Sequence, residues 1–141
     1  MSIVITGTPG VGKHTIAKKL AKDLNYKILD INKIAIESKV FEKQNDVLDV
    51  DINKLKKILK NKITKNTIVV GHLAPYVLSK NQVKKAIILR KNPYKLRSVY
   101  KQRKYSAKKI SENLGSEILG VIAYDSTKKF GKTKSYQIDS S

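Results

Sequence analysis

The sequence predicts a single α/β domain in which helices cover a parallel β-sheet. Short β-branched runs alternate with amphipathic segments along the 141 residues, and a glycine-rich turn joins the first run to the first amphipathic segment. Strands separated by helices pair in parallel through right-handed crossovers. The length fits one domain, and a hydrophobic fraction of 40% is enough for one core. We therefore expect residues 1–141 to fold as one unit.

Five segments are expected to be strands of this sheet. Each is short and rich in β-branched or aliphatic residues, as buried parallel strands are. In chain order they are Ser2–Thr6, Tyr26–Ile31, Thr67–Val70, Ala86–Leu89 and Ser135–Ile138.

Four segments between the strands have helical periodicity. Lys13–Leu24 and Asp51–Lys62 carry apolar residues at helical spacing. Pro93 suits the first turn of a helix that runs to about Arg103. Ser106 can cap the last helix, because its hydroxyl accepts a hydrogen bond from a free amide of the first turn. The apolar face expected for this last helix is Ile110, Leu114, Ile118, Val121 and Ile122.

The segment Asn32–Asp51 differs in composition from the rest of the chain. It holds five of the eleven acidic residues, although the chain as a whole is basic. These five are Glu37, Glu42, Asp46, Asp49 and Asp51. We interpret this segment as an inserted excursion and not as a linker.

The chain is strongly basic, with 30 Lys and Arg against 11 Asp and Glu and a net charge of +19. Only Arg90, Arg97 and Arg103 are arginines, although arginine is the better residue for bidentate contacts to phosphates and bases. A general lysine bias and a nucleic-acid-binding surface are both open explanations of the charge. The absence of cysteine excludes a disulfide scaffold, thiol catalysis and a cysteine-held metal.

Neither a membrane span nor a signal peptide is expected. No apolar run approaches the roughly 20 residues that a span needs. Residues Met1–Thr6 have no basic region ahead of an apolar stretch. The expectation is a cytoplasmic protein that has no membrane partner.

Two sets of residues offer contacts to RNA, and a structural interpretation competes with each. The tyrosines at 94, 100, 105, 124 and 136 could stack on bases, but their spacing favours positions in the core or at its boundary. For a run of lysines we favour a solvated helix face, with contact to ribosomal RNA as the alternative. This run is Lys54, Lys56, Lys57, Lys60, Lys62 and Lys65.

The segment Gly7-Thr8-Pro9-Gly10-Val11-Gly12-Lys13 lies between the first strand and the first helix, where a phosphate-binding loop belongs. Glycines let the backbone turn so that successive N–H groups point at phosphate oxygens, and the helix N-terminus adds a partial positive charge. Lys13 can reach the β- and γ-phosphates of a nucleoside triphosphate. The residues expected to bind the nucleotide are Gly10, Val11, Gly12, Lys13, His14 and Thr15.

One position in this loop departs from the usual motif. The residue after the lysine is normally serine or threonine, whose hydroxyl coordinates Mg²⁺, but here it is His14. A neutral imidazole is a poor ligand for a hard cation that prefers oxygen. Thr15 supplies the next hydroxyl and is our candidate magnesium ligand. The substitution weakens the case for magnesium coordination but not the case for phosphate binding.

Three motifs occur in the order found in a known family. They are the phosphate loop, Gly71-His72-Leu73 after the third strand, and Arg103-Lys-Tyr-Ser-Ala-Lys-Lys-Ile-Ser-Glu-Asn113 with Glu117-Ile118 beyond it. Together they resemble the adenylate kinase isoenzyme 6 family, also called CINAP, and its archaeal adenylate kinase members. The resemblance covers nearly the whole chain, and the third motif is its most specific part.

The resemblance implies a three-layer P-loop nucleoside monophosphate kinase fold with a five-stranded parallel sheet. It implies a short monophosphate-binding segment at about residues 30–50 and a short lid at about residues 102–112. The implied reaction transfers the γ-phosphate of ATP, with Mg²⁺, to AMP or another nucleoside monophosphate, and ATP hydrolysis accompanies it. The implied partners are a small-subunit ribosomal protein of the platform and rRNA, during maturation of the small subunit.

The resemblance also implies roles for individual residues. Arg103, at the base of the lid, matches an arginine that grips the transferring phosphates, a task that suits the guanidinium fork. His72, at the carboxyl end of a buried strand, matches a histidine that orients a water or the acceptor. Together with Lys13 these are the expected catalytic residues. The acid that the family carries two residues before this histidine is replaced by Val70.

Other positions depart from the family as well. The arginine expected four residues before Arg103 is replaced by Val99, for which Arg97 could substitute, and the glycine expected after Arg103 is Lys104. Relatives continue beyond the last strand with an adenine-side loop and a final helix, whereas this sequence stops at Ser141. We expect weak adenine discrimination and a less covered sheet.

Three functional hypotheses follow from the sequence. The leading one is a nucleoside monophosphate kinase with associated ATPase activity. Its rival is a catalytically degenerate member that binds nucleotide as a switch in ribosome assembly, which His14 and Val70 support. A general RNA-binding protein comes third, because only the net charge supports it.

Overall fold

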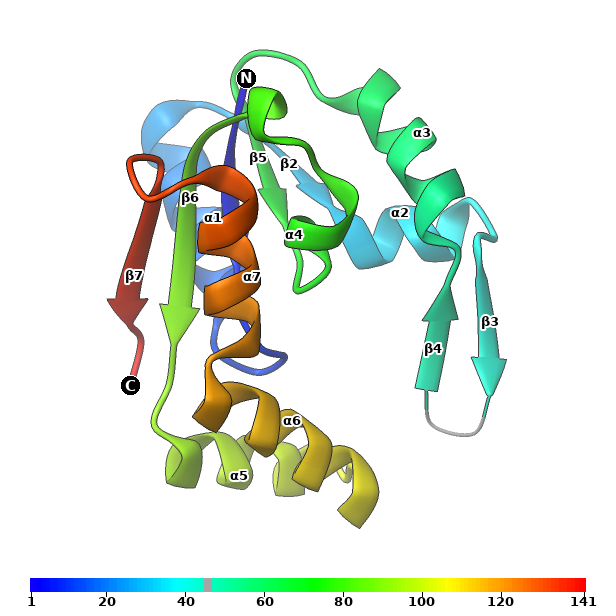
Figure 1. Cartoon of the computed structure of the whole chain (residues 1–141), viewed down its shortest axis with the longest axis vertical. Coiled ribbons are helices and arrows are strands. Elements are labelled where there is room, and N and C mark those ends of the chain that lie inside the picture. The colour runs from blue at the N-terminus through cyan, green and yellow to red at the C-terminus, as the bar shows by residue number, and fades with distance from the viewer. Residues whose placement is uncertain (45–46) are drawn as a thin grey trace.

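A five-stranded sheet with the order β2-β5-β1-β6-β7 forms the centre of the molecule in the computed structural model (Figure 1). The structure describes residues 1–44 and 47–141. Each pairing between neighbouring strands of this sheet is parallel. The strands are β1 (Ser2–Thr6), β2 (Lys27–Asp30), β5 (Thr67–Val70), β6 (Val83–Arg90) and β7 (Ser135–Asp139). The predicted fold class and all five predicted strands are confirmed, although β6 begins before the expected Ala86.

Helices cover both faces of the sheet, so the fold has three layers (Figure 1). Side chains alternate between the faces of a strand, and neighbouring residues of β1 therefore enter different cores. Val4 packs on the side covered by α2, α3, α4 and α7, whereas Ile5 packs on the side covered by α1 and α5. These helices are α1 (Lys13–Leu24), α2 (Ile31–Glu37), α3 (Ile52–Lys62), α4 (Ala74–Val77), α5 (Pro93–Gln102) and α7 (Val121–Phe130).

Two small excursions lie beyond the carboxyl ends of the strands, in the lower half of Figure 1. β3 (Phe41–Gln44) and β4 (Val47–Val50) form an antiparallel hairpin between α2 and α3. The predicted monophosphate-binding segment therefore consists of α2 and this hairpin, while residues 45–46, including Asp46, lie outside the described part. The predicted lid spans the end of α5, a tight turn and the first half of α6 (Ala107–Leu119).

The helix predicted to start after Ser106 is in fact two helices. Ser106 caps α6 as expected, because its Oγ accepts a hydrogen bond from the backbone N–H of Lys109 at 3.2 Å. Gly120 has a φ of 66°, in the left-handed region, and the chain changes direction there before α7. The predicted apolar face is therefore wrong at Ile118 and Val121, which are 64% and 37% exposed, while Ile122 is buried.

The prediction that five tyrosines pack in or beside the core holds for only two of them. Tyr100 is buried and Tyr105 is half-buried, whereas Tyr94, Tyr124 and Tyr136 are exposed. Tyr136 lies on β7, whose residues are mostly exposed because this strand is at an edge of the sheet. Within residues 1–44 and 47–141, no helix is long and apolar enough to cross a bilayer.

Candidate nucleotide-binding site

A cavity of about 660 Å³ opens at the carboxyl end of the sheet. The phosphate loop, the end of β2, the turn after β5 and the start of α6 all contribute to its lining. The three predicted catalytic residues, Lys13, His72 and Arg103, come together here. Of the remaining residues predicted to bind nucleotide, Gly10, Gly12, His14 and Thr15 also line it. Its volume is typical of small-ligand sites, which range over roughly 300–1,000 Å³.

The side chain of Lys13 is enclosed by its own loop. Its Nζ donates hydrogen bonds to the carbonyl oxygens of Gly7 at 3.0 Å and Thr8 at 3.1 Å, and the residue is only 6% exposed. Burial, and after it the positive charge of Arg103, lowers the pKa of Lys13 to about 8, although the Asp30 and Glu117 carboxylates act in the opposite direction. An anion that enters the loop would favour the charged form of this lysine.

Two glycines allow the loop to turn. Gly10 and Gly12 have φ values of 89° and 96°, which side chains other than glycine rarely adopt. A Cβ on Gly10 would also lie 3.0 Å from the ring of Tyr100. Gly10 is therefore required by both conformation and space, whereas Gly12, with open space around it, is required by conformation alone.

Val11 is not among the described residues that line the cavity. Its side chain is 1% exposed and packs in the core with Leu96 and Tyr100, and its carbonyl oxygen accepts a hydrogen bond from Ser140 Oγ at 2.7 Å. The prediction that Val11 binds nucleotide therefore concerns only its backbone.

Tyr100 of α5 contacts the phosphate loop and supports it, a role that the sequence analysis missed. Its hydroxyl donates a hydrogen bond to the carbonyl oxygen of Pro9, and its ring stacks on Tyr105 with 5.2 Å between ring centres. Burial raises the pKa of Tyr100, so the hydroxyl stays protonated and remains a donor over the whole physiological range. The sequence contained only a weak indication of this role, because Tyr100 lies four residues after Leu96, at helical spacing, but belongs to no motif.

Glu117 is a second support that the sequence indicated only as part of a family signature. It is 3% exposed, and its Oε1 accepts a hydrogen bond from Thr8 Oγ1 at 3.0 Å. Its Oε2 accepts from the backbone N–H of Lys91 at 2.7 Å, and Arg90 Nε lies 3.3 Å from Oε1. This buried carboxylate therefore ties the phosphate loop to α6 and to the end of β6.

The turn after α5 and the first turn of α6 each present one cation to the cavity. Arg103 is exposed and donates a hydrogen bond from Nη1 to the hydroxyl of Tyr105 at 3.3 Å. Lys109, which the sequence analysis gave no role, places its Nζ 4.0 Å from the centre of the Tyr105 ring. Arg97, the possible substitute for an arginine at Val99, lies exposed on α5 and is absent from the described lining of this cavity. Its proposed substitution therefore stays a prediction.

His72 is a neutral group in this basic surrounding. Burial, and then the charges of Lys13 and Lys109, lower the pKa of His72 to about 4. At neutral pH its imidazole can therefore orient a polar ligand but adds no positive charge. Val70, two residues earlier, is fully buried in the core beside α1 and offers no oxygen to the cavity.

His14 pairs with an acid that the sequence analysis did not single out. Its Nε2 lies 2.7 Å from Oδ2 of Asp30, the last residue of β2. Asp30 also caps α2, because its Oδ1 accepts a hydrogen bond from the backbone N–H of Lys33 at 3.2 Å. The signal in the sequence was an acid at the carboxyl end of a strand, where ligands bind in parallel sheets.

The described residues form no magnesium site built from acidic and histidine side chains alone. Mg²⁺ favours an octahedral set of oxygen ligands, yet in the described part of the chain no three acidic or histidine side chains form a group that could hold a metal. Both carboxylate oxygens of Asp30 already have partners, and Val70 replaces the expected acid. The hydroxyl of Thr15 lines the cavity and stays our predicted contact. Magnesium would enter with ATP as part of the substrate.

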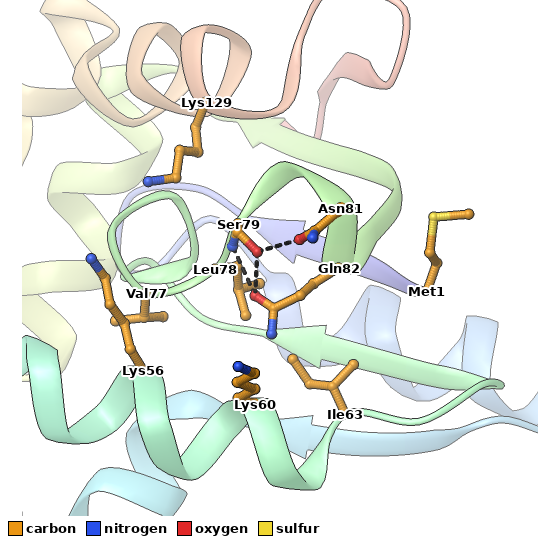
Figure 2. Close-up of a pocket in the computed structure, with 10 residues that line it drawn as sticks. All are labelled: Met1, Lys56, Lys60, Ile63, Val77, Leu78, Ser79, Asn81, Gln82 and Lys129. Carbon is orange, nitrogen blue, oxygen red and sulfur yellow. Dashed lines mark hydrogen bonds between the residues drawn. The ribbon is translucent and has the colours of Figure 1, made fainter.

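A second cavity, of about 510 Å³, lies at the opposite end of the sheet (Figure 2). Met1 and Gln82, which precede β1 and β6, line it, so it is far from the phosphate loop. Lys56 and Lys60 reach it from α3, and Lys129 reaches it from α7. None of its described lining residues is acidic. It is therefore a basic cavity that contains none of the predicted site residues.

A family model described as an AAA domain matches residues 3–120. The chain belongs to this family. A protein named "Putative adenylate kinase" from Saccharolobus solfataricus is 34% identical over 142 residues, which cover 99% of this chain and 74% of that protein. One of the same name from Pyrococcus furiosus is 37% identical over 123 residues, which cover 86% of this chain and 66% of that protein. This AAA-domain protein is thus a homologue of archaeal adenylate kinase-like proteins.

Solved structures support the fold of this family member. The YorR protein of Bacillus subtilis, in complex with phosphorylated GDP, superposes with a TM-score of 0.65 and 17% identity, covering 99% of this chain and 86% of that one. Shikimate kinase from Aquifex aeolicus gives a TM-score of 0.62 and 15% identity, with the same coverage. At such identities the likeness concerns the fold, which is the α/β P-loop kinase fold that the sequence predicted.

Proposed function

We propose that this protein is an adenylate kinase-like phosphotransferase that moves the γ-phosphate of ATP to AMP or another nucleoside monophosphate. The observation that carries the proposal is the convergence of three cations, Lys13, Arg103 and Lys109, on one cavity at the carboxyl end of the sheet. Phosphoryl transfer requires little covalent chemistry from the protein, and cationic positioning supplies most of the catalysis.

The phosphate loop and Lys13 are proposed to hold the triphosphate of ATP. The backbone N–H groups from Gly10 to Thr15 and the N-terminus of α1 favour phosphate oxygens there. Arg103, after α5, and Lys109, in the first turn of α6, are proposed to approach the γ-phosphate as parts of the short lid. The bond from the γ-phosphorus to the β-phosphate oxygen breaks, and a bond to the acceptor oxygen forms. The guanidinium stabilises the charge on the transferring group.

The acceptor is proposed to lie between the β2–α2 corner and the hairpin. Val50, Ile52 and Leu73 give this side of the cavity apolar walls that suit a nucleobase. Asn32 Oδ1 is buried and has no hydrogen-bond partner among the described residues, so it can accept a hydrogen bond from the base or ribose. The acceptor phosphate, whose second pKa is about 6, needs no general base at neutral pH. His72 is proposed to orient it, or a water in its place during ATP hydrolysis.

A coupled assay of ADP formation from ATP with AMP, CMP, UMP or GMP tests this proposal. Arg103→Ala is expected to lower the rate by at least about a hundredfold, as loss of a transition-state cation does. Arg97→Ala is the matched control, because it removes an exposed arginine outside the cavity. Measurable ATP binding without turnover would reject the kinase and favour the nucleotide-binding switch.

We also propose, from the family resemblance, a cytoplasmic protein of the isoenzyme 6 type that acts in small-subunit maturation with a platform protein and rRNA. The basic cavity of Figure 2 is the proposed RNA contact. Replacing Lys56, Lys60 and Lys129 together by Gln should lower the salt dependence of binding to an rRNA fragment by about two to three charges. The matched control replaces Lys18, Lys19 and Lys22 of α1, on the other face. Equal effects would mean that only the net charge acts.

A further inference from the structure

We infer that the basic cavity of Figure 2 is a second phosphate-binding site, which takes a compact ligand with two or more adjacent phosphate groups. The cavity lies at the end of the sheet opposite the phosphate loop, so it is separate from the proposed nucleotide site. The inference rests on the proposed RNA contact in one respect, that phosphate groups meet the protein here. It adds that a small molecule is sufficient to occupy the site.

The place of the cavity between packed elements is the first argument. α4 packs against both α3 and α7, and the segment that follows α4 supplies Leu78, Ser79, Asn81 and Gln82 to the lining. The volume of about 510 Å³ falls within the range of roughly 300–1,000 Å³ that is usual for small-ligand sites. The size of the cavity therefore suits a compact ligand.

The lysines of the cavity are the second argument. Lys56 and Lys60 are four residues apart in α3, so they lie on the same face of this helix, one turn apart. Lys129 reaches the cavity from α7. Among the described residues no ion pair joins these three lysines to an acid. The acid of α7, Asp125, accepts a hydrogen bond from the hydroxyl of Tyr76 and lies outside the lining. The three charges are thus available to a ligand with more than one phosphate.

The side-chain amides of the cavity are the third argument. The backbone N–H of Ser79 donates a hydrogen bond to Oε1 of Gln82 at 2.8 Å, and Ser79 Oγ donates to Oδ1 of Asn81 (Figure 2). Both amide oxygens are therefore engaged, and each amide has its NH₂ group left as a donor. In Figure 2 the amide nitrogen of Gln82 points toward Lys60. Donors beside lysines match the oxygens of an anion.

The apolar floor of the cavity strengthens these contacts. Val77 and Leu78 are 2% and 1% exposed, and the half-buried Ile63 packs against the same core. Charges beside a buried apolar surface are screened less by water than charges on an open surface. The basic cavity thus combines cations with a wall of low dielectric constant, which distinguishes it from a solvated lysine-rich helix face.

Titration of inorganic pyrophosphate into the isotope-labelled full chain, followed by NMR chemical shifts of the backbone amides, tests the inference. Saturable shifts are expected at Ser79, Asn81 and Gln82, separately from any shifts in the phosphate loop. Replacing Lys56, Lys60 and Lys129 together by Gln should weaken binding at the basic cavity at least about tenfold, the effect of losing one charge-assisted hydrogen bond. Shifts in the phosphate loop should be unchanged by this triple substitution.

The matched control replaces three exposed lysines of the same two helices that are absent from the described lining, Lys57, Lys62 and Lys128, by Gln. Both triple variants lose the same charge, and circular dichroism establishes that each is folded. The control should change the affinity at the basic cavity by less than about threefold. Equal losses in the two variants would show that only the net charge attracts the ligand, and would overturn the inference.

A single-stranded RNA oligonucleotide separates the inference from the proposed RNA contact. If RNA displaces pyrophosphate from the cavity, the phosphates of a strand use the same site; if it does not, the site takes small molecules only, and both results support the inference. RNA that shifts the cavity amides while pyrophosphate does not would overturn the inference and leave the RNA contact standing. If neither ligand shifts them, both fail at this cavity, while the kinase proposal at the other end of the sheet is unaffected.

Discussion

Replacing Lys13 by Met should stabilise the ligand-free protein at pH 7, although Lys13 is the residue on which nucleotide binding is proposed to depend. The side chain is 6% exposed, and its pKa falls from 10.5 to about 8. That difference corresponds to roughly 3 kcal/mol by which the fold disfavours the charged lysine at neutral pH. Methionine retains an apolar stem but loses the two hydrogen bonds to Gly7 and Thr8, at about 1 kcal/mol each. The expected net gain is about 1 kcal/mol, or about 4 °C in Tm.

The pH dependence provides the decisive measurement. Between pH 8 and 10.5 the unfolded lysine binds a proton that the folded one has lost, so the free energy of unfolding of the wild type rises with pH in this window. The advantage of Lys13→Met should therefore be full at pH 7 and reversed at pH 10, where the remaining charge penalty is smaller than the loss of the two hydrogen bonds and the variant is less stable by about 1 kcal/mol. Thermal unfolding followed by circular dichroism at the two pH values measures this, with exposed Lys18→Met as the control. A variant that is less stable at pH 7, or equally favoured at both pH values, would refute the reasoning.

Three further predictions concern the supports of the loop and the neutral histidine. Glu117→Gln removes the charge that faces Arg90 in a buried site and should lower the free energy of unfolding, measured by urea titration, by about 3 kcal/mol. The control Glu112→Gln changes an exposed residue and should alter this free energy by less than about 0.5 kcal/mol. Equal effects of the two substitutions would contradict the structural role of the buried carboxylate. Tyr100→Phe loses the hydrogen bond to Pro9 and should cost about 1 kcal/mol, with the same value at pH 7 and pH 9 because the hydroxyl stays protonated. Because the pKa of His72 is about 4, the pH–rate profiles of the wild type and of His72→Gln should have the same shape between pH 5.5 and 8. An inflection in this range that is present in the wild type and absent from His72→Gln would show that this imidazole titrates there.

Elements whose pattern is local could be predicted from the sequence. β1, α1 and β5 begin and end where expected, because a run of β-branched residues or a helical repeat needs no distant partner to be recognised. The phosphate loop is equally local, since its glycines and Lys13 are contiguous in the chain. The early start of β6 was missed because two adjacent lysines, Lys84 and Lys85, separate Val83 from the aliphatic run that follows.

What the sequence by itself determined is therefore the fold class and the phosphate loop, while the tertiary structure decided what surrounds that loop. Thr8 meets Glu117 across 109 positions, and Tyr100 meets Pro9 across 91. His14 reaches Asp30 because β1 and β2 both flank β5, so that the helix after β1 and the end of β2 lie at one edge. Periodicity records only which face of an element is apolar. The pairing of distant polar groups depends on strand order and helix direction, which are properties of the whole packed chain.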